Sequence, residues 1–155
     1  MVESPTLRPA DPADAAEIAR LCSELGYPAT AAQVAPRLRT LSDGTRYLVL
    51  VAAAPQRRLL GWMVAEQRVS LESGAMAEIT GLVVDAKARR QGVGRALVAA
   101  AEAWARRRGL AAICVRSNVT RTESHPFYEG VGYRRKKSQH AYVKSLPPRD
   151  VAAAE

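Results

Sequence analysis

The sequence of 155 residues lacks the features that mark membrane and secreted proteins. No apolar stretch reaches the roughly 18 residues that are needed to cross a bilayer. The first 17 residues contain no apolar run and include acidic side chains, unlike a secretion signal. The chain is therefore predicted to be cytoplasmic, with no membrane partner.

Cysteine is scarce as well. Cys22 falls in a helical pattern and Cys114 in a strand pattern, and neither has a C-x-x-C partner or a Cys/His cluster nearby. Isolated cysteines of this kind usually behave as small buried hydrophobes. We therefore expect two buried thiols, no catalytic cysteine and no metal site.

Acidic residues are fewer than basic ones: the chain has 15 Asp and Glu and 23 Lys and Arg, which gives a net charge of +8. This balance favours an anionic partner, either nucleic acid, a membrane surface or an anionic small molecule. Two basic runs, at 106–108 and 134–137, have few aromatic residues interleaved with them, and cations are favoured at helix ends in any case. We expect both runs to be solvated, so nucleic acid is not the expected partner.

Hydrophobic spacing and turn residues predict an α/β fold in the order β-α-α-β-β-β-α-β-α-β-β. The strand–helix–strand segment from Glu78 to Val115 implies a parallel pair, and the strands before it are connected as hairpins. We therefore predict a mixed, mostly antiparallel sheet with helices on both faces, forming one domain over 1–146, followed by a disordered tail over 147–155. The expected strands are 6–9, 47–53, 59–69, 77–84, 111–115, 133–136 and 141–144, and the expected helices are 12–25, 30–41, 92–108 and 125–131.

The most informative segment runs from Glu78 to Leu97, where a strand leads into a basic loop with two glycines and then a long helix. The first turn of a helix has unpaired N–H groups and the positive end of the helix dipole. Gly92 and Gly94 leave the backbone open to a bulky anion, and basic side chains surround them. This combination predicts a pyrophosphate site.

Two common phosphate-binding motifs do not fit this loop. The P-loop string G-x-x-x-x-G-K-[ST] does not occur, and the third glycine of a dinucleotide fingerprint is replaced by Leu97. The pattern that is present, Arg89-x-x-Gly92-x-Gly94, resembles the acetyl-CoA signature of the GCN5-related N-acetyltransferase (GNAT) superfamily. The resemblance extends over nearly the whole chain through the order of elements and the later string F-Y-E-G-V-G-Y (127–133).

This resemblance implies an acetyl-CoA-dependent N-acetyltransferase that moves acetyl onto a primary amine by direct attack in a ternary complex. It implies that the strand before the loop pairs with the pantetheine arm, with the amide of Val83 on the acetyl oxygen, and that the loop holds the pyrophosphate. Glycine at position 81 inside this strand suggests a bulge or a close backbone approach. The implied cofactor-binding residues are Leu82, Val83, Val84, Arg89, Arg90, Gln91, Gly92, Val93, Gly94, Arg95, Ala96 and, further on, Asn118.

Two catalytic residues follow from the same resemblance. Tyr128 matches the tyrosine that protonates the departing CoA thiolate, and a packing role is the alternative. Glu78 matches a glutamate that deprotonates the amine in some relatives, and substrate binding or a structural ion pair is the alternative. Because Glu78 lies four residues before Leu82, we expect both side chains on one face of the strand. His125 is expected to have a packing or capping role.

The chain departs from the family pattern where many relatives carry an asparagine six residues before the tyrosine, since Thr122 stands there and Asn118 lies four residues earlier. The acceptor cannot be read from the sequence: a protein N-terminus, a polyamine, an amino sugar and a small foreign amine all remain open. A non-catalytic acetyl-CoA-binding or sensing module is the alternative function. Relatives are often dimers, so a homodimer is a further expectation.

Overall fold

A computed structural model describes residues 5–118, 120–121 and 123–149 of the chain. Contacts divide the chain into two compact units, Met1–Arg116 and Ser117–Glu155, and each is described by itself. In the described part of the chain, no helix is long and apolar enough to cross a membrane. The predicted tail begins at residue 147, and its last residues, 150–155, lie outside the described residues.

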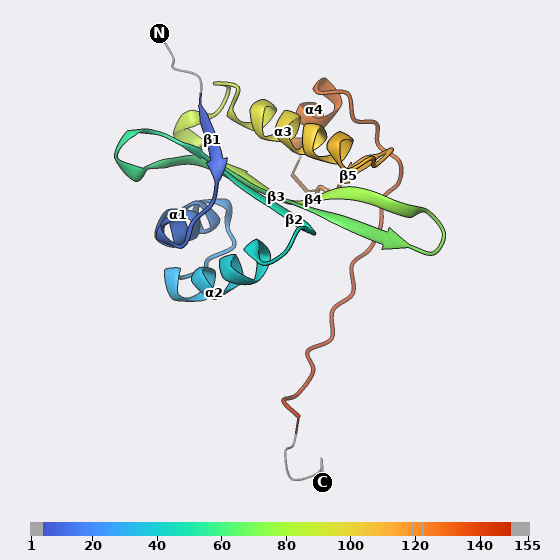
Figure 1. The fold of residues 1–155 in the computed structure, drawn as a ribbon, viewed down its shortest axis with the longest axis horizontal. Helices are drawn as coiled ribbons and strands as arrows, with labels where there is room; N and C mark the ends of the chain where they lie inside the picture. Colours follow the sequence, from blue (N-terminus) through green and yellow to red (C-terminus); the bar gives the residue numbers. More distant parts are fainter. Residues whose placement is uncertain (1–4, 119, 122, 150–155) are drawn as a thin grey trace. The chain divides into compact units, whose positions relative to one another are not determined.

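The first unit is built on a five-stranded sheet in the order β1-β2-β3-β4-β5. The first four strands pair antiparallel, and β4 and β5 pair parallel, as predicted. Helices α1 and α2 lie on one face of this sheet, and α3 lies on the other (Figure 1). The bounds are β1 Thr6–Pro9, α1 Ala15–Leu25, α2 Ala31–Ser42, β2 Tyr47–Ala53, β3 Leu59–Ser70, β4 Gly74–Val84, α3 Val93–Arg107 and β5 Ile113–Val115.

Short polar residues set the starts of the helical segments, and a glycine ends α1. Thr30 starts α2 with a capping box, in which its hydroxyl accepts from Gln33 N and the Gln33 side chain accepts from Thr30 N. Asp11 forms the same arrangement with Asp14, but the turn it starts is a 3-10 helix, Pro12–Asp14, and α1 begins after it. Gly26 ends α1 with φ of 97°, a left-handed conformation that suits glycine.

The sheet alternates between its two faces. On the α1–α2 face, Leu21 and Leu38 pack in one cluster with Val51, Leu59 and Val83, all buried. On the other face, Met63 is fully buried. There the backbone of Gly61 lies close to α3, because an added Cβ would come within 3.2 Å of Val93 and 2.7 Å of a backbone oxygen of β4. Both faces of the sheet are therefore filled, which fixes the strand register.

A bulge in β4 corrects one expectation. Ile79 pairs with Ala65 and Gly81 with Val64, so Thr80 is an extra residue in β4. One extra residue inverts the alternation of side chains beyond it. As a result, Glu78 lies on the α1–α2 face together with Gly81 and Val83, and the expectation that it shares a face with Leu82 is wrong.

A buried carboxylate ties β4 to α1 and β3. Asp85 is 1% exposed and directly follows β4. Its oxygens accept from the backbone N–H of Lys87 at 2.8 Å and from Arg20 at 3.1 Å, and Arg58 lies at 3.4 Å. Burial alone would raise the pKa of Asp85, but these hydrogen bonds outweigh it and hold the pKa below its ordinary value.

We expect Asp85→Asn to lower the free energy of unfolding by roughly 2–3 kcal/mol at pH 7, because the change removes a buried charge from two arginines that stay partly exposed. A lowered folded-state pKa stabilises the protein above the unfolded-state pKa, and this stabilisation is lost as the pH falls. The difference between variant and wild type in urea unfolding should therefore stay constant from pH 7 to about pH 5 and shrink only below about pH 5, as the pH falls through the unfolded-state pKa and then the folded-state pKa. Exposed Asp43→Asn is the control, and an equal loss in both variants would contradict this role for Asp85.

The second unit contains helix α4, Ser124–Gly130, close to the predicted helix. The two strands predicted at 133–136 and 141–144 are wrong, because residues 133–149 contain no helix or strand. The side chains of Tyr142, Val143 and Leu146 are 89%, 93% and 81% exposed. An alternating pattern gives a strand only where a neighbouring edge accepts its hydrogen bonds, and no such pairing forms within residues 133–149.

Candidate functional site

Strands β4 and β5 part at a defined point. Their parallel pairing covers only three residue pairs and ends with Ile79 opposite Val115, whereas β4 runs on to Val84. From Thr80 onward, the β5 side of β4 has no paired strand among the described residues. An open strand edge of this kind can bind an extended ligand through main-chain hydrogen bonds.

The backbone of β4 shows which groups face this open edge. Asp85 N donates to Leu60 O at 2.8 Å, so the amide of Asp85 faces β3. Because backbone groups alternate along a strand, Val83 also faces β3, and the N–H and C=O groups of Leu82 and Val84 face the open edge. Val83 was predicted to supply the amide for the acetyl oxygen, but this alternation favours Leu82.

Gly81 has a packing reason within the sheet. A Cβ atom at this position would meet the indole ring of Trp62 at 2.5 Å. The small residue is therefore required by the α1–α2 face of the sheet, and it lies next to the bulge at Thr80 that the sequence suggested.

The loop after β4 brings an unpaired backbone to the start of α3. Arg90 and Gly92 have φ of 64° and 82°, and Gly92 directly precedes the helix. Its carbonyl accepts from Ala96 N at 2.9 Å, and no side-chain hydrogen bond from the described residues caps the first turn. The amides of Val93, Gly94 and Arg95 are therefore available to an anion, at the positive end of the helix dipole.

Side chains of the same loop add positive charge. Arg89, Arg90 and Arg95 are exposed, as are Gln91 and Gly92. Val93 is 2% exposed and is packed against the sheet, so only its backbone can contact a ligand. The structure thus brings the predicted residues from Arg89 to Ala96 together at one helix end, which is the arrangement that binds phosphate groups.

Glu78 lies where β4 and β5 part, and it is ion-paired. Its side chain is 7% exposed. Arg68 donates to its Oε2 at 2.8 Å, and Arg116 Nε lies 3.1 Å from its Oε1. Cys114 Sγ is also within 3.6 Å of Oε1. The structure therefore supports the ion-pair alternative for Glu78, and any proton transfer to it requires that an arginine move away.

Neither cysteine has the character of a nucleophile. Both are half-buried rather than fully buried. Burial raises the pKa of the Cys114 thiol, and the negative charge of Glu78 raises it further. Burial also raises the pKa of Cys22. Both therefore stay protonated at neutral pH, and the structure shows no group of three or more metal-ligating side chains within the residues it describes.

Within the second unit, Tyr128 lies on α4. Its ring packs edge-on against Phe127 and Tyr133, at centroid distances of 5.1 Å and 6.1 Å. Burial raises the pKa of its phenol, and the charge of Arg121 lowers it less. A raised pKa keeps the phenol protonated at neutral pH, which suits a proton donor.

The asparagine and histidine of this unit stabilise its own loop. Asn118 Oδ1 accepts from Thr120 N at 3.0 Å and from Thr120 Oγ1 at 2.8 Å. The His125 ring nitrogen Nε2 lies 3.2 Å from the backbone oxygen of Asn118, a contact with the loop that precedes α4. Thr122, the position at which the sequence departs from the family pattern, lies outside the described residues.

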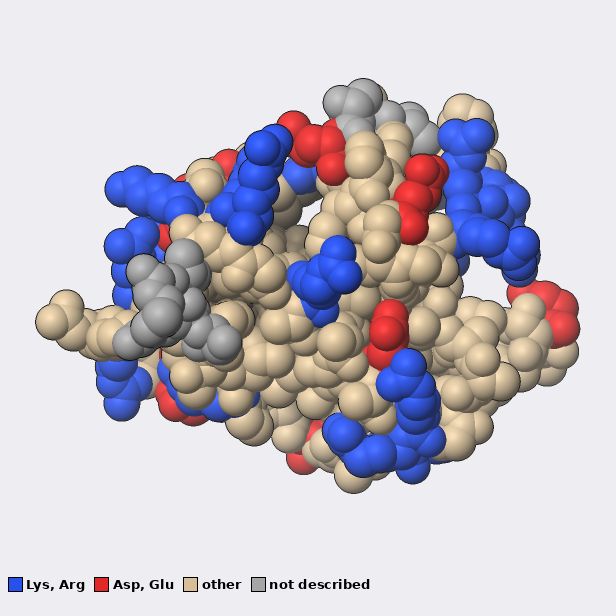
Figure 2. Space-filling view, turned by 90° about the horizontal axis from the view of Figure 1, so that it is seen from above, with Lys and Arg blue, Asp and Glu red and all other residues tan. Residues whose placement is uncertain are grey.

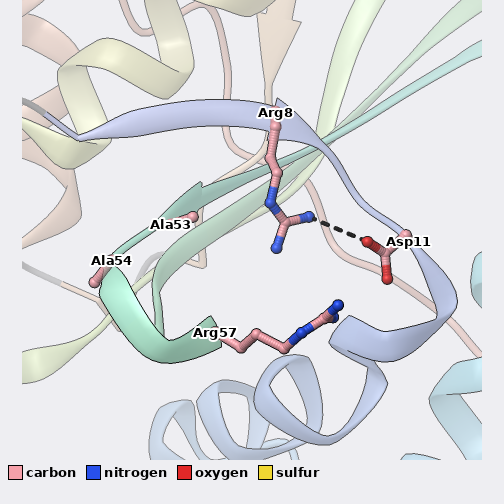
Figure 3. Close-up of a pocket in the computed structure, with 5 residues that line it drawn as sticks. All are labelled: Arg8, Asp11, Ala53, Ala54 and Arg57. Atoms are coloured by element: carbon pink, nitrogen blue, oxygen red, sulfur yellow. Dashed lines mark ion pairs between the residues drawn. The ribbon is translucent and has the colours of Figure 1, made fainter.

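A hollow of about 270 Å³ elsewhere in the first unit is lined by Arg8, Asp11, Ala53, Ala54 and Arg57 (Figure 3). The guanidinium of Arg8 already pairs with Asp11 at 3.6 Å and with Asp14 at 2.8 Å. None of these residues belongs to the predicted site, so the hollow is not part of that site.

The sequence interpretation missed three residues around the site: Arg68, Arg116 and Asp85. The Asp-Ala-Lys string after the strand could have indicated Asp85, since aspartate often caps a turn two residues ahead. Nothing in the sequence indicated Arg68 and Arg116, because they reach Glu78 from a different strand and from the end of β5.

Comparison with known proteins agrees with these features. The model of the Acetyltransferase (GNAT) family matches residues 14–133. A Klebsiella aerogenes protein named aminoglycoside N(6')-acetyltransferase type 1 is 32% identical over 152 residues, covering 94% of this chain and 100% of its own.

Two solved structures share the fold. An aminoglycoside 6'-N-acetyltransferase from Acinetobacter baumannii is 19% identical, with a TM-score of 0.78 over 93% of this chain and 100% of its own. An aminoglycoside N-acetyltransferase solved in complex with CoA is 16% identical, with a TM-score of 0.79 over 91% of this chain and 95% of its own. Together with the family match, these findings establish that the chain belongs to the GNAT family and is an acetyltransferase that uses acetyl-CoA to acetylate an amine.

Proposed function

We propose that the chain acetylates the primary amine of a small molecule by direct attack on acetyl-CoA in a ternary complex. The observation that carries this proposal is the open edge of β4, which leads directly to the uncapped first turn of α3. The pyrophosphate would bind at 89–96, and the pantetheine arm would lie along Leu82–Val84 like an added strand.

This placement fixes the direction of the bound thioester. The phosphate end lies beyond Val84, so the arm runs back along β4 toward the point where β4 and β5 part. The acetyl group would then lie near the bulge at Thr80, with the outward amide of Leu82 within reach of its carbonyl oxygen. Such an amide stabilises negative charge that develops on this oxygen. Glu78, four residues before Leu82 on the same strand, would then receive the acceptor.

Chemically, a C–N bond forms between the amine and the acetyl carbon while the C–S bond of the thioester breaks. The amine must reach the site unprotonated or lose its proton there, because an alkylammonium has no lone pair. Glu78 holds the ammonium end of the acceptor and takes the proton once its arginines release it. Tyr128 protonates the departing thiolate, and the raised pKa of its phenol keeps that proton available.

The test is CoA release, measured with a panel of amines that begins with aminoglycosides, since a curated relative carries that name. We expect turnover with at least one amine in the presence of acetyl-CoA. A folded sample that binds acetyl-CoA but releases no CoA with any amine would instead support the non-catalytic binding module.

We further propose that the protein acts in the cytoplasm as a homodimer. The exposed Tyr142, Val143 and Leu146 support this, because apolar side chains at 81–93% exposure are typical of surfaces covered by a partner. Sedimentation equilibrium should give twice the chain mass, and Tyr142→Ser/Val143→Ser should shift the protein toward monomer. A wild-type monomer at all concentrations would contradict this.

A further inference from the structure

The charges around Glu78 restrict the acceptor, provided that the proposed function holds. Two carboxylates, Glu66 and Glu78, lie among three arginines, Arg46, Arg68 and Arg116. The cluster therefore carries a net positive charge. The carboxylates are the less exposed partners, at 16% and 7%, whereas Arg46, Arg68 and Arg116 are 62%, 46% and 71% exposed. A ligand that approaches the cluster thus meets guanidinium groups first.

Arg68 and Arg116 have guanidinium N–H groups that their contacts with Glu66 and Glu78 do not use. A guanidinium has five N–H donors, and Arg116 contacts Glu78 through Nε. Arg68 divides its contacts between Glu78, through Nη1, and Glu66, at 3.5 Å from Nε. The remaining N–H groups of both residues can bind a carboxylate or a phosphate, the anions that match guanidinium geometry.

Most carboxylates in the first unit are already neutralised in this way. Figure 2 shows Lys and Arg side chains close to Asp and Glu side chains on one face of the molecule. Apart from the cluster around Glu78, ion pairs of the first unit join Arg8 to Asp11 and Asp14, Arg20 to Glu17, Glu24 and Asp85, and Arg106 to Glu102. A polycation would need several uncompensated carboxylates, whereas the net charge of the chain is +8.

We propose that the acceptor is a small amine whose molecule also carries an anionic group, a carboxylate or a phosphate. Glu78 binds the ammonium, and Arg116 and Arg68 bind the anion. An acceptor of this kind replaces the Arg116–Glu78 contact without a loss of charge pairing, because each group gains a new partner of opposite sign. A polycationic acceptor that bound Glu78 would displace Arg116 from this carboxylate, and it would bring no anion to pair with the displaced guanidinium.

The experiment compares matched acceptors in the CoA-release assay. L-ornithine is paired with putrescine to test a carboxylate, glucosamine 6-phosphate is paired with glucosamine to test a phosphate, and tobramycin represents a polycation. We expect at least one anionic acceptor to exceed its partner, and tobramycin, by tenfold or more in kcat/KM. Arg116→Gln should reduce this preference at least fivefold, mainly through a higher KM for the anionic acceptor. Arg106→Gln removes the same charge from an exposed position on α3 and should leave the preference unchanged.

Arg68→Gln serves as a second variant, with its melting temperature measured because Arg68 contacts both carboxylates. Preferred turnover of tobramycin or putrescine, or an unchanged preference in Arg116→Gln, would overturn the inference about the acceptor and leave the proposed function standing. No CoA release with any acceptor, from protein that binds acetyl-CoA, would overturn both.

Discussion

The double variant Gly92→Glu/Gly94→Glu should lose more than 100-fold in affinity for acetyl-CoA, which corresponds to about 2.7 kcal/mol or more. Two carboxylates would stand at the positive end of α3 and repel the phosphates that we propose bind at its first-turn amides. At Gly92 the φ of 82° also strains any side chain, so the backbone would be displaced from the cradle. Isothermal titration calorimetry with acetyl-CoA measures the change directly.

The control for this variant is Gly44→Glu. Gly44 also has a positive φ, of 89°, and an added Cβ would meet nothing within 4 Å, so the substitution brings a comparable backbone strain and one added negative charge to a different loop. We expect micromolar binding to persist in this control. If the double variant also bound acetyl-CoA normally, the loop from Arg89 to Ala96 would be a turn without a role in cofactor binding.

Tyr128→Phe should lower kcat by about 100- to 10,000-fold, the range over which a positioned proton donor accelerates a reaction. The affinity for acetyl-CoA should stay within about twofold, because the change leaves the ring packing against Phe127 and Tyr133 in place. Steady-state CoA release and calorimetry on the same sample separate the two effects. An enzyme that keeps its full kcat would show that Tyr128 only packs.

The pH dependence gives a second readout of the same role. Burial raises the pKa of Tyr128 above its ordinary value, so the phenol remains a donor through neutral pH and loses its proton only as the pH rises through that raised pKa. The wild type should therefore lose kcat on the alkaline side, and Tyr128→Phe should lack this loss. Tyr133→Phe removes a neighbouring hydroxyl and should retain the wild-type profile.

For Glu78, the sequence predicted the position along the strand but not the face of the sheet or the neighbouring charges. The position of this residue at the end of the β4–β5 pairing follows from the order of elements up to β5, which the sequence predicted correctly. The face of the sheet on which Glu78 lies does not follow from the order of elements, because it depends on the bulge at Thr80, which arises from how β4 pairs with β3. Its charge environment depends on Arg68 and Arg116, which are 10 and 38 residues away along the chain and meet it only in the folded sheet.

In the segment over 133–144, the sequence predicted strands that the structure does not contain. The pattern over 133–144 resembles two strands, but strand formation requires an edge to pair with, and an alternating sequence carries no information about that edge. The residues that end helices are local in origin, and there the predictions for Thr30 and Gly26 were confirmed.

The sequence alone indicated the family and the cofactor and predicted the position of the phosphate cradle, because these depend on a glycine-rich loop, a helix start and residues close together along the chain. Only the tertiary structure decided which amides of β4 face the open edge, which side of the sheet Glu78 occupies and that arginines neutralise it. These features arise from strand register and from contacts between distant segments, which follow from packing rather than from local spacing.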